Sequence, residues 1–231
     1  MKYEFYWPVI WQYRGLLLEG FRITMTLFAA GTVSSIVLGT FVGVAGASER
    51  RWARMIGELY VEINRNTPLV VKMFLLYFGL GLDAYPAAIV GLAIHHSAYV
   101  GEIVRAGIQS IPRGQTEAAL STGMSRFQAS RFVILPQAFV IIIPPMTTQV
   151  LEVLKNSSIA MTISIPELTF QTQQIEATTF RGFEAATAAT FAYLAVAGII
   201  ALGAFTIERA LIRRQQRSVR LVLLPATVGE P

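Results

Sequence analysis

Residues 113–136 read RGQTEAALSTGMSRFQASRFVILP and form the most polar long segment of an otherwise apolar chain. Apolar runs flank this segment on both sides, and its own apolar residues recur at helical spacing. From these residues alone we expect a short amphipathic helix at about 113–126, which Gly123 can end, in a loop between two membrane spans. The pattern fits two interpretations, a docking element for another protein and a solvated connector.

The composition is that of an integral membrane protein. Of 231 residues, 54% are hydrophobic and only 14% are charged, whereas soluble domains carry about a quarter charged residues. We therefore expect one all-α transmembrane domain over residues 1–231 and no separate soluble domain. The net charge of +5 is attributed to arginines on the cytoplasmic side of a membrane, so lipid rather than nucleic acid is the expected partner.

The side chains typical of catalytic and metal sites are scarce. The chain has no cysteine, which excludes disulfides and thiolate chemistry. Its two histidines, His95 and His96, are adjacent, whereas helical metal ligands usually stand four residues apart on one face. Neither paired catalytic carboxylates nor a nucleophile–base motif is recognisable, so a membrane-embedded enzyme has no support and no cofactor is predicted.

Hydropathy predicts five transmembrane helices, because a helix needs about 20 apolar residues to cross the hydrocarbon core. The expected spans are about 23–46, 56–82, 87–108, 132–154 and 187–207. Residues 1–20 are rich in Tyr and Trp and predict an interfacial lead-in helix, with a soluble amphipathic cap as the alternative. The first span ends in a small-residue sequence that resembles a signal-peptidase site, but its apolar run is too long for a signal peptide, so we expect it to be uncleaved.

Three features interrupt this pattern. Pro68 should break the second span, and Pro144 and Pro145 should kink or break the fourth. Residues 164–186 are expected to be a polar connector between the last two spans.

The placement of arginines predicts the orientation. The loop at 47–55, the segment at 113–136 and the tail at 209–231 are rich in arginine, whereas the 81–86 and 164–186 connections hold one arginine between them. The arginine-rich parts are therefore expected in the cytoplasm, with the N-terminus outside and the C-terminus inside. The tail is expected to lie near anionic lipids at the membrane surface.

The polar segment resembles a known motif. Glu117-Ala118-Ala119, Gly123 and Leu135-Pro136 resemble the EAA signature of membrane subunits of ATP-binding-cassette importers, with Val133 in place of the usual Ile. Residues 97–112, SAYVGEIVRAGIQSIP, with the following Gly114-Gln115, resemble the branch that takes up polar amino acids. Residues 66–69, NTPL, resemble that branch's Gly-Thr-Pro-Leu with Asn66 in place of Gly, and the resemblance covers about residues 20–209.

The resemblance implies a type I importer fold in a bacterial inner membrane. It implies a second permease subunit, either the same chain or a paralogue, two cytoplasmic ATPase subunits and an extracytoplasmic solute-binding protein. The coupling residues would be Glu117, Ala118, Ala119 and Gly123. The chain has no G-x-x-x-x-G-K-[ST] loop, so ATP hydrolysis is expected in a separate subunit and this chain is expected to be non-catalytic.

A polar cluster follows the fourth span at Glu152, Lys155, Asn156 and Ser157. Ionisable groups at membrane depth usually face a partner or a water-filled pathway. The cluster is therefore a candidate substrate site, and the alternative is an internal Glu152–Lys155 pair that only braces the helix.

Permeases of the branch that this chain resembles carry Asp at the position of Asn156. Losing that charge lowers the repulsion of an acidic substrate. The runs at 155–163, 169–176 and 180–184 resemble glutamate/aspartate permease subunits. The resemblance therefore implies an acidic amino acid or its amide as substrate, with another polar or basic amino acid as the alternative.

Three residues near the break of the second span complete the candidate substrate site. Arg65 would meet a substrate carboxylate, or pair structurally with Glu62 or Glu102. Thr67 lies in the break itself, and His96 either lines the cavity or is hydrogen-bonded within the bundle. Intramembrane charges and broken helices also fit an ion-coupled carrier or a channel, and the dependence of transport on an ATPase would separate these classes.

Overall fold

The computed structural model describes residues 3–223, and the regular elements in this range are all helices. They are α1 (Pro8–Gln12), α2 (Arg14–Gly46), α3 (Arg51–Arg65), α4 (Leu69–Phe74), η1 (Leu75–Gly79), α5 (Ala84–Gln109), α6 (Arg113–Ser121), α7 (Arg126–Ala129), η2 (Ser130–Ile134), α8 (Leu135–Asn156), η3 (Ser157–Ile163), α9 (Leu168–Thr179) and α10 (Gly182–Leu223). Of the short elements, η1 and η2 are π-helical and η3 is a 3-10 helix. The predicted all-α class is confirmed.

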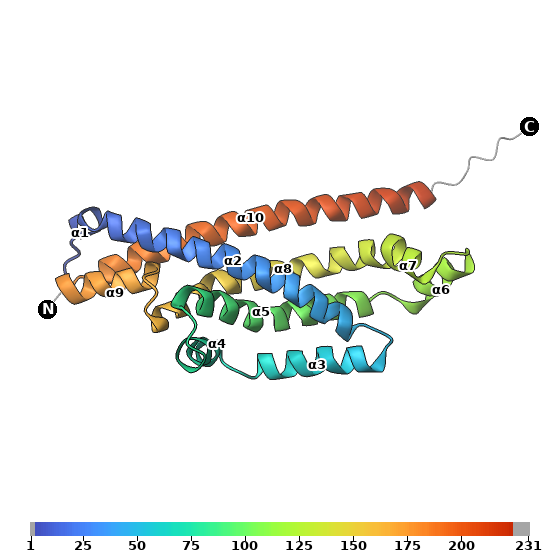
Figure 1. Cartoon of the computed structure of the whole chain (residues 1–231). Coiled ribbons are helices and arrows are strands. Elements are labelled where there is room, and N and C mark those ends of the chain that lie inside the picture. The colour runs from blue at the N-terminus through green and yellow to red at the C-terminus, as the bar shows by residue number, and fades with distance from the viewer. Residues whose placement is uncertain (1–2, 224–231) are drawn as a thin grey trace, which may run out of the picture.

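Long helices run side by side along the molecule (Figure 1). Helices α2, α5, α8 and α10 form this bundle; α1 and α9 lie at one end, called here the α9 end, and α6 and α7 lie at the other, the α6 end. By length and hydropathy, four helical stretches of the described residues suit a membrane crossing: Arg14–Gly46, Ala84–Gln109, Arg126–Ile163 and Gly182–Leu211. These four match the first, third, fourth and fifth predicted spans.

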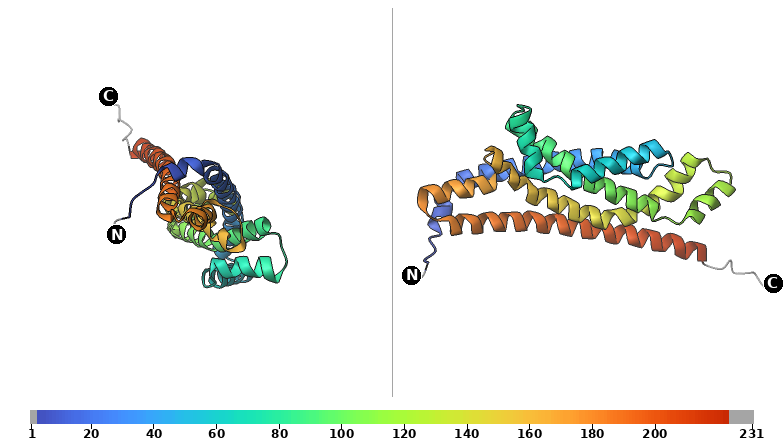
Figure 2. Two further views of the ribbon diagram at one scale, coloured as in Figure 1. Left: turned by 90° about the vertical axis from the view of Figure 1, so that its left-hand side faces the viewer. Right: turned by 90° about the horizontal axis from the view of Figure 1, so that it is seen from below.

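The second predicted span is not one apolar helix. The chain forms α3, which carries Glu58, Glu62 and Arg65, and a shorter apolar helical stretch, Leu69–Gly79. The two are separated at the predicted break, where Pro68 has an extended ψ of 144°. Figure 2 shows α4 standing out from the side of the bundle.

The first long helix packs closely on α5 through small side chains. The buried residues of α2 recur every three or four positions: Gly20, Thr24, Leu27, Gly31, Ser35, Gly39, Gly43 and Gly46. A Cβ added at Gly39 would lie 2.5 Å from the Val100 side chain, and one at Gly43 would lie 2.5 Å from the Gly101 carbonyl oxygen. Backbone contact of this kind is the usual role of small residues in membrane helix pairs.

Other predicted boundaries differ from the structure. The expected lead-in helix at 1–20 is only the short α1, because α2 already begins at Arg14. The expected connector at 164–186 contains α9, which Glu167 caps by accepting hydrogen bonds from the backbone N–H groups of Thr169 and Phe170. Pro144 and Pro145 lie inside α8, which continues past them, so a break at these residues is ruled out.

The C-terminal part of α10 extends beyond the apolar stretch. The helix continues to Leu223, and the Arg209 guanidinium carbon lies 4.1 Å from the centre of the Phe205 ring. Residues 224–231 of the predicted basic tail lie outside the described part of the chain.

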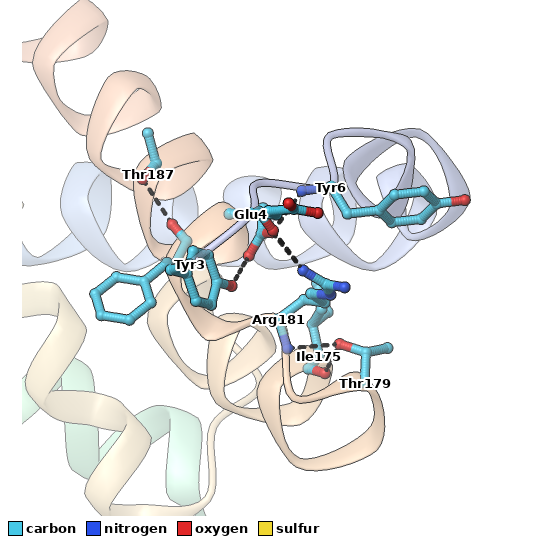
Figure 3. A network of polar contacts seen from close by, with 9 residues as sticks. Tyr3, Glu4, Tyr6, Ile175, Thr179, Arg181 and Thr187 are labelled. Atoms are coloured by element: carbon cyan, nitrogen blue, oxygen red, sulfur yellow. Dashed lines mark hydrogen bonds and ion pairs between the residues drawn. The ribbon is translucent and has the colours of Figure 1, made fainter. Parts of the chain in front are cut away.

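A polar network fastens the N-terminal segment to the start of α10 (Figure 3). The Tyr3 hydroxyl and the Tyr6 backbone N–H donate to the two carboxylate oxygens of Glu184, which is fully buried. Arg181 donates to the Glu4 carbonyl at 2.7 Å and lies 3.5 Å from the Glu184 carboxylate. These contacts fix the α9 end of the bundle.

Candidate functional site

The predicted coupling segment forms α6 and a tight turn outside the long bundle. The helix ends at Ser121, and Gly123 follows with a φ of +85°, a left-handed conformation that favours glycine. The N–H groups of Gly123 and Met124 bond to the carbonyls of Leu120 and Ala119 at 3.0 and 3.3 Å. Gly123 therefore ends the helix, as the sequence predicted. The last helical residue is Ser121, five residues before the predicted boundary of about 126.

The side chains of this segment divide into two sets. Ala119 is buried within the chain, 6% exposed. Glu117 and Ala118 are exposed, and so are the apolar side chains of Leu120, Met124 and Phe127. An exposed apolar patch at a loop that also carries charged residues is typical of a protein-binding surface. Its Arg126 pairs with Glu49 and so joins the segment to the loop between α2 and α3.

Lys72 holds the two sides of the break in the second span together. Lys72 is 8% exposed, and its ammonium group donates hydrogen bonds to the carbonyls of Asn64 and Thr67 at 2.6 and 3.0 Å. It also lies 3.1 Å from His95 Nδ1, on α5. A lysine ammonium has three donors, and these three acceptors use all of them. The sequence interpretation missed Lys72, although a lysine within the apolar run 69–79 was a visible signal.

His96 lies at the meeting point of α5 and α8. It is 1% exposed, with Nδ1 at 2.5 Å from the Gln149 amide and Nε2 at 3.2 Å from the Asn156 amide. Both contacts are made by side-chain amide nitrogens, which are donors, and a neutral imidazole has one acceptor nitrogen, so His96 accepts a hydrogen bond from one of the two amides. The structure therefore brings together two predicted site residues, His96 and Asn156, within a buried hydrogen-bond network.

The other members of the cluster lie at the end of α8. The Lys155 ammonium is 2.5 Å from the Glu152 carboxylate, and both side chains are exposed. The internal pair offered as an alternative is thus present. Ser157 is fully buried and donates to the Leu154 carbonyl at 2.7 Å, so its hydroxyl has a local structural partner. The exposed side chains that a ligand can reach here are those of Glu152 and Lys155.

Arg65 lies apart from this cluster, in a cleft of about 550 Å³ between α2, α3 and α5. Its guanidinium carbon is 5.3 Å from the centre of the Tyr99 ring. Glu62 and Glu102 line the same cleft, but within residues 3–223 no ion pair joins Arg65 to either of them. Thr67 lies nearby in the break, where its hydroxyl donates to the Ile63 carbonyl at 2.8 Å.

The sequence is similar to known transport proteins over most of its length. Residues 35–217 match the family described as binding-protein-dependent transport system inner membrane component. The chain is 31% identical to the glutamine transport system permease protein GlnP of Escherichia coli, over 95% of this chain and 100% of that protein. It is 34% identical to the glutamate/aspartate import permease protein GltJ of Escherichia coli, over 85% of this chain and 87% of that protein.

Solved structures agree with the sequence similarity. A crystal structure of an amino acid ABC transporter with histidines contains a chain that is 32% identical, with a TM-score of 0.82 over 91% of this chain and 100% of that chain. An inward-facing structure of the MetNI methionine ABC transporter shares the fold at 20% identity, with a TM-score of 0.75 over 88% of this chain and 98% of that chain. The resemblance to amino acid ABC importer permeases that the motifs predicted is therefore confirmed. The chain belongs to the family of binding-protein-dependent transport system inner membrane components.

Proposed function

We propose that this chain is the permease subunit of an ATP-driven importer for glutamate, aspartate or their amides. The observation that carries the proposal is α6, an EAA-type helix exposed at one end of the bundle. The similarity to glutamine and glutamate/aspartate permeases supports the substrate class. The chain would act in the bacterial inner membrane with a second permease subunit, a cytoplasmic ATPase dimer and an extracytoplasmic solute-binding protein.

Coupling would work through the α6 segment. In this proposal the ATPase holds Glu117, Ala118, Ala119 and Gly123, and the exposed apolar residues Leu120 and Met124 add contact area. The Arg126–Glu49 pair is a surface contact between α7, which follows α6, and the loop that precedes α3. ATP-driven closure of the motor would then open the pathway alternately to each side of the membrane.

Substrate contacts would come from the end of α8 and the break beside α4. The exposed Lys155 ammonium suits a substrate carboxylate, and Glu152 suits an ammonium group. Asn156 is held by His96, so it presents a neutral amide where a negative charge would repel an acidic substrate. Arg65 and Thr67 belong to the same proposed pathway on the other side of the His95-His96 pair.

Uptake by the purified complex tests this function. The permease is reconstituted into liposomes with its ATPase and solute-binding protein, and uptake of labelled glutamate, aspartate, glutamine, asparagine and arginine is measured with and without ATP. We expect ATP-dependent uptake of acidic amino acids or their amides. Uptake of arginine alone would show that the substrate is another class of amino acid. Uptake that does not depend on ATP and instead follows an ion gradient would identify an ion-coupled carrier.

A further inference from the structure

The cleft around Arg65 has its own set of charged groups, separate from those at the end of α8. Glu58, Glu62 and Arg65 stand at positions i, i+4 and i+7 of α3 and share one exposed face that lines the cleft. Within the described residues none of the three has a side-chain hydrogen bond or an ion pair. Two carboxylates and one guanidinium are therefore available to a ligand.

The charged side chains on the opposite wall of the cleft, Glu102 and Arg105, are already paired with each other. Arg105 on α5 donates to both carboxylate oxygens of Glu102, at 2.6 and 3.0 Å, and to Gln109 at 2.8 Å. The aromatic face of Tyr99 lies beneath Arg65 and limits the directions in which the guanidinium can point. The volume of about 550 Å³ falls within the range of small-molecule sites.

A group that matches this arrangement carries a negative and a positive charge a few ångströms apart. The headgroup of an α-amino acid has this property, because its carboxylate can accept two hydrogen bonds from a guanidinium while its ammonium donates to a carboxylate. Arg65 would bind the α-carboxylate, and Glu62 or Glu58 would bind the α-ammonium. Such recognition does not depend on the side chain of the amino acid.

The position of the cleft indicates where in the pathway this binding would occur. The cleft reaches Gly46, the last residue of α2, and Arg105 near the end of α5, so it lies toward the α6 end of the bundle. A chain of contacts links the cleft wall to Asn156: the ring of Tyr99, which lines the cleft, is 5.3 Å from that of His95, His95 is 5.1 Å from His96, and His96 contacts the Asn156 amide at 3.2 Å. The cleft and the α8 cluster are thus neighbouring but distinct places.

We propose that the cleft lined by Glu58, Glu62, Arg65 and Tyr99 is a second, exit-side binding site for the headgroup of the transported amino acid. This inference rests on the proposed function, because it takes the substrate to be an amino acid and the α6 end to face the cytoplasm. A transported amino acid would leave the α8 cluster, pass the rings of His96, His95 and Tyr99, and occupy the cleft before it enters the cytoplasm.

Thiol labelling tests the proposal, since the chain has no cysteine of its own. The complex of permease and ATPase is prepared in lipid nanodiscs without nucleotide, with Glu58→Cys as the reporter inside the cleft. The rate of modification by a small water-soluble thiol reagent is measured with and without millimolar L-glutamine or L-glutamate. We expect the amino acid that the complex transports to slow the reaction several-fold. The same amino acid with its α-carboxylate amidated or its α-amine acetylated should give no protection.

Two matched variants make the result specific. Arg54→Cys lies one turn away on the same face of α3 and outside the cleft lining, so its labelling should be unaffected by the amino acid. Adding Glu62→Gln or Arg65→Gln to the Glu58→Cys reporter should raise the concentration for half-protection about tenfold or more, because each removes the charged partner of one end of the headgroup.

Three outcomes would overturn the proposal. The first is a Glu58→Cys labelling rate that the transported amino acid leaves unchanged. The second is equal slowing at Arg54→Cys, which indicates a general closure of the complex. The third is equal protection by the amidated or acetylated compounds. Absence of any amino acid uptake by the wild-type complex would instead contradict the proposed function, so the two failures are distinguishable.

Discussion

At the scale of single residues, Lys72 shows how a membrane protein stabilises a broken helix. A break exposes backbone carbonyls that water cannot reach at membrane depth, and each must find another donor. The Lys72 ammonium supplies donors to the carbonyls of Asn64 and Thr67 and is itself buried. Its contact with His95 adds a link to α5, so one side chain joins three segments.

We expect Lys72→Met to destabilise the subunit, because it leaves the buried Asn64 carbonyl and the half-buried Thr67 carbonyl without this donor. The cost should be about 1–3 kcal/mol for each unsatisfied group. The loss of stability is measured as a lower midpoint temperature of thermal unfolding for the purified complex in detergent. Lys155→Met is the control, since Lys155 is exposed and should change the midpoint little. Equal midpoints for the wild type and Lys72→Met would show that Lys72 does not hold the break.

The charge at position 156 gives a second residue-scale prediction. Asn156→Asp places a carboxylate beside His96 and near Lys155, and this charge would repel an acidic substrate. Uptake of glutamate should fall about tenfold or more, and competition by arginine should increase. Asn156→Ser is the control, because it removes the amide without adding a charge. Unchanged glutamate uptake and unchanged arginine competition in Asn156→Asp would remove this residue from the substrate site.

At the scale of elements, the packing of α2 on α5 depends on the absence of side chains at two positions. At Gly39 an added Cβ would lie 2.5 Å from Val100 and 2.7 Å from the Ser97 carbonyl oxygen. The surrounding backbone must move to accept any larger residue, because packed interiors have little free space.

Gly39→Leu should therefore reduce the amount of folded subunit in the membrane several-fold. The measurement is the yield of monodisperse protein after detergent extraction. Gly198→Leu is the matched control, since nothing lies within 4 Å of a Cβ added at Gly198 on α10. A normal yield for Gly39→Leu would mean that α2 and α5 separate more easily than the contacts indicate.

The α6 segment carries a prediction about coupling. Gly123→Asp puts a side chain where φ is +85° and adds a charge to the exposed apolar patch, and Glu117→Lys reverses the charge of the motif. Each should abolish ATP-dependent uptake while the subunit remains inserted and folded. Gly114→Ala, in the same helix and with nothing within 4 Å of the added Cβ, should keep near wild-type uptake. Full uptake in both of the first two variants would exclude a coupling role for α6.

The sequence predicted apolar elements well and polar contacts poorly, for a physical reason. The third span was expected at 87–108 and is Ala84–Gln109, because hydropathy depends on composition alone. The break at Pro68 was also predictable, since proline lacks a donor. Pro144 and Pro145 were expected to kink or break the fourth span; the break is ruled out because α8 continues past both residues, and the kink stays a prediction. The contacts of Lys72 and His96 join residues 5 to 60 positions apart, and most of these separations are too long for a local pattern to record.

At the scale of the whole molecule, the number of membrane crossings depends on the stretch from α3 to η1. Helices α2 and α5 both run from the α9 end to the α6 end, and between them the chain passes back through α3 and α4 (Figure 1). The stretch that makes this passage is divided between the charged α3 and the short apolar segment Leu69–Gly79. We propose that the two halves together form the fifth crossing, with charges of α3 facing the water-filled pathway.

Accessibility of single introduced cysteines distinguishes this arrangement from a stretch that enters and leaves on one side. Arg50→Cys precedes α3 and Asp83→Cys follows η1, both at exposed positions. With a membrane-impermeant maleimide on spheroplasts, we expect Asp83→Cys to react at once and Arg50→Cys only after the membrane is permeabilised. Ser121→Cys in α6 and Ala177→Cys in α9 flank the single helix α8 and serve as the inside and outside references. If Asp83→Cys instead behaves like Ser121→Cys, the stretch does not cross, and the direction of α5 must then be explained by a re-entrant α3–η1.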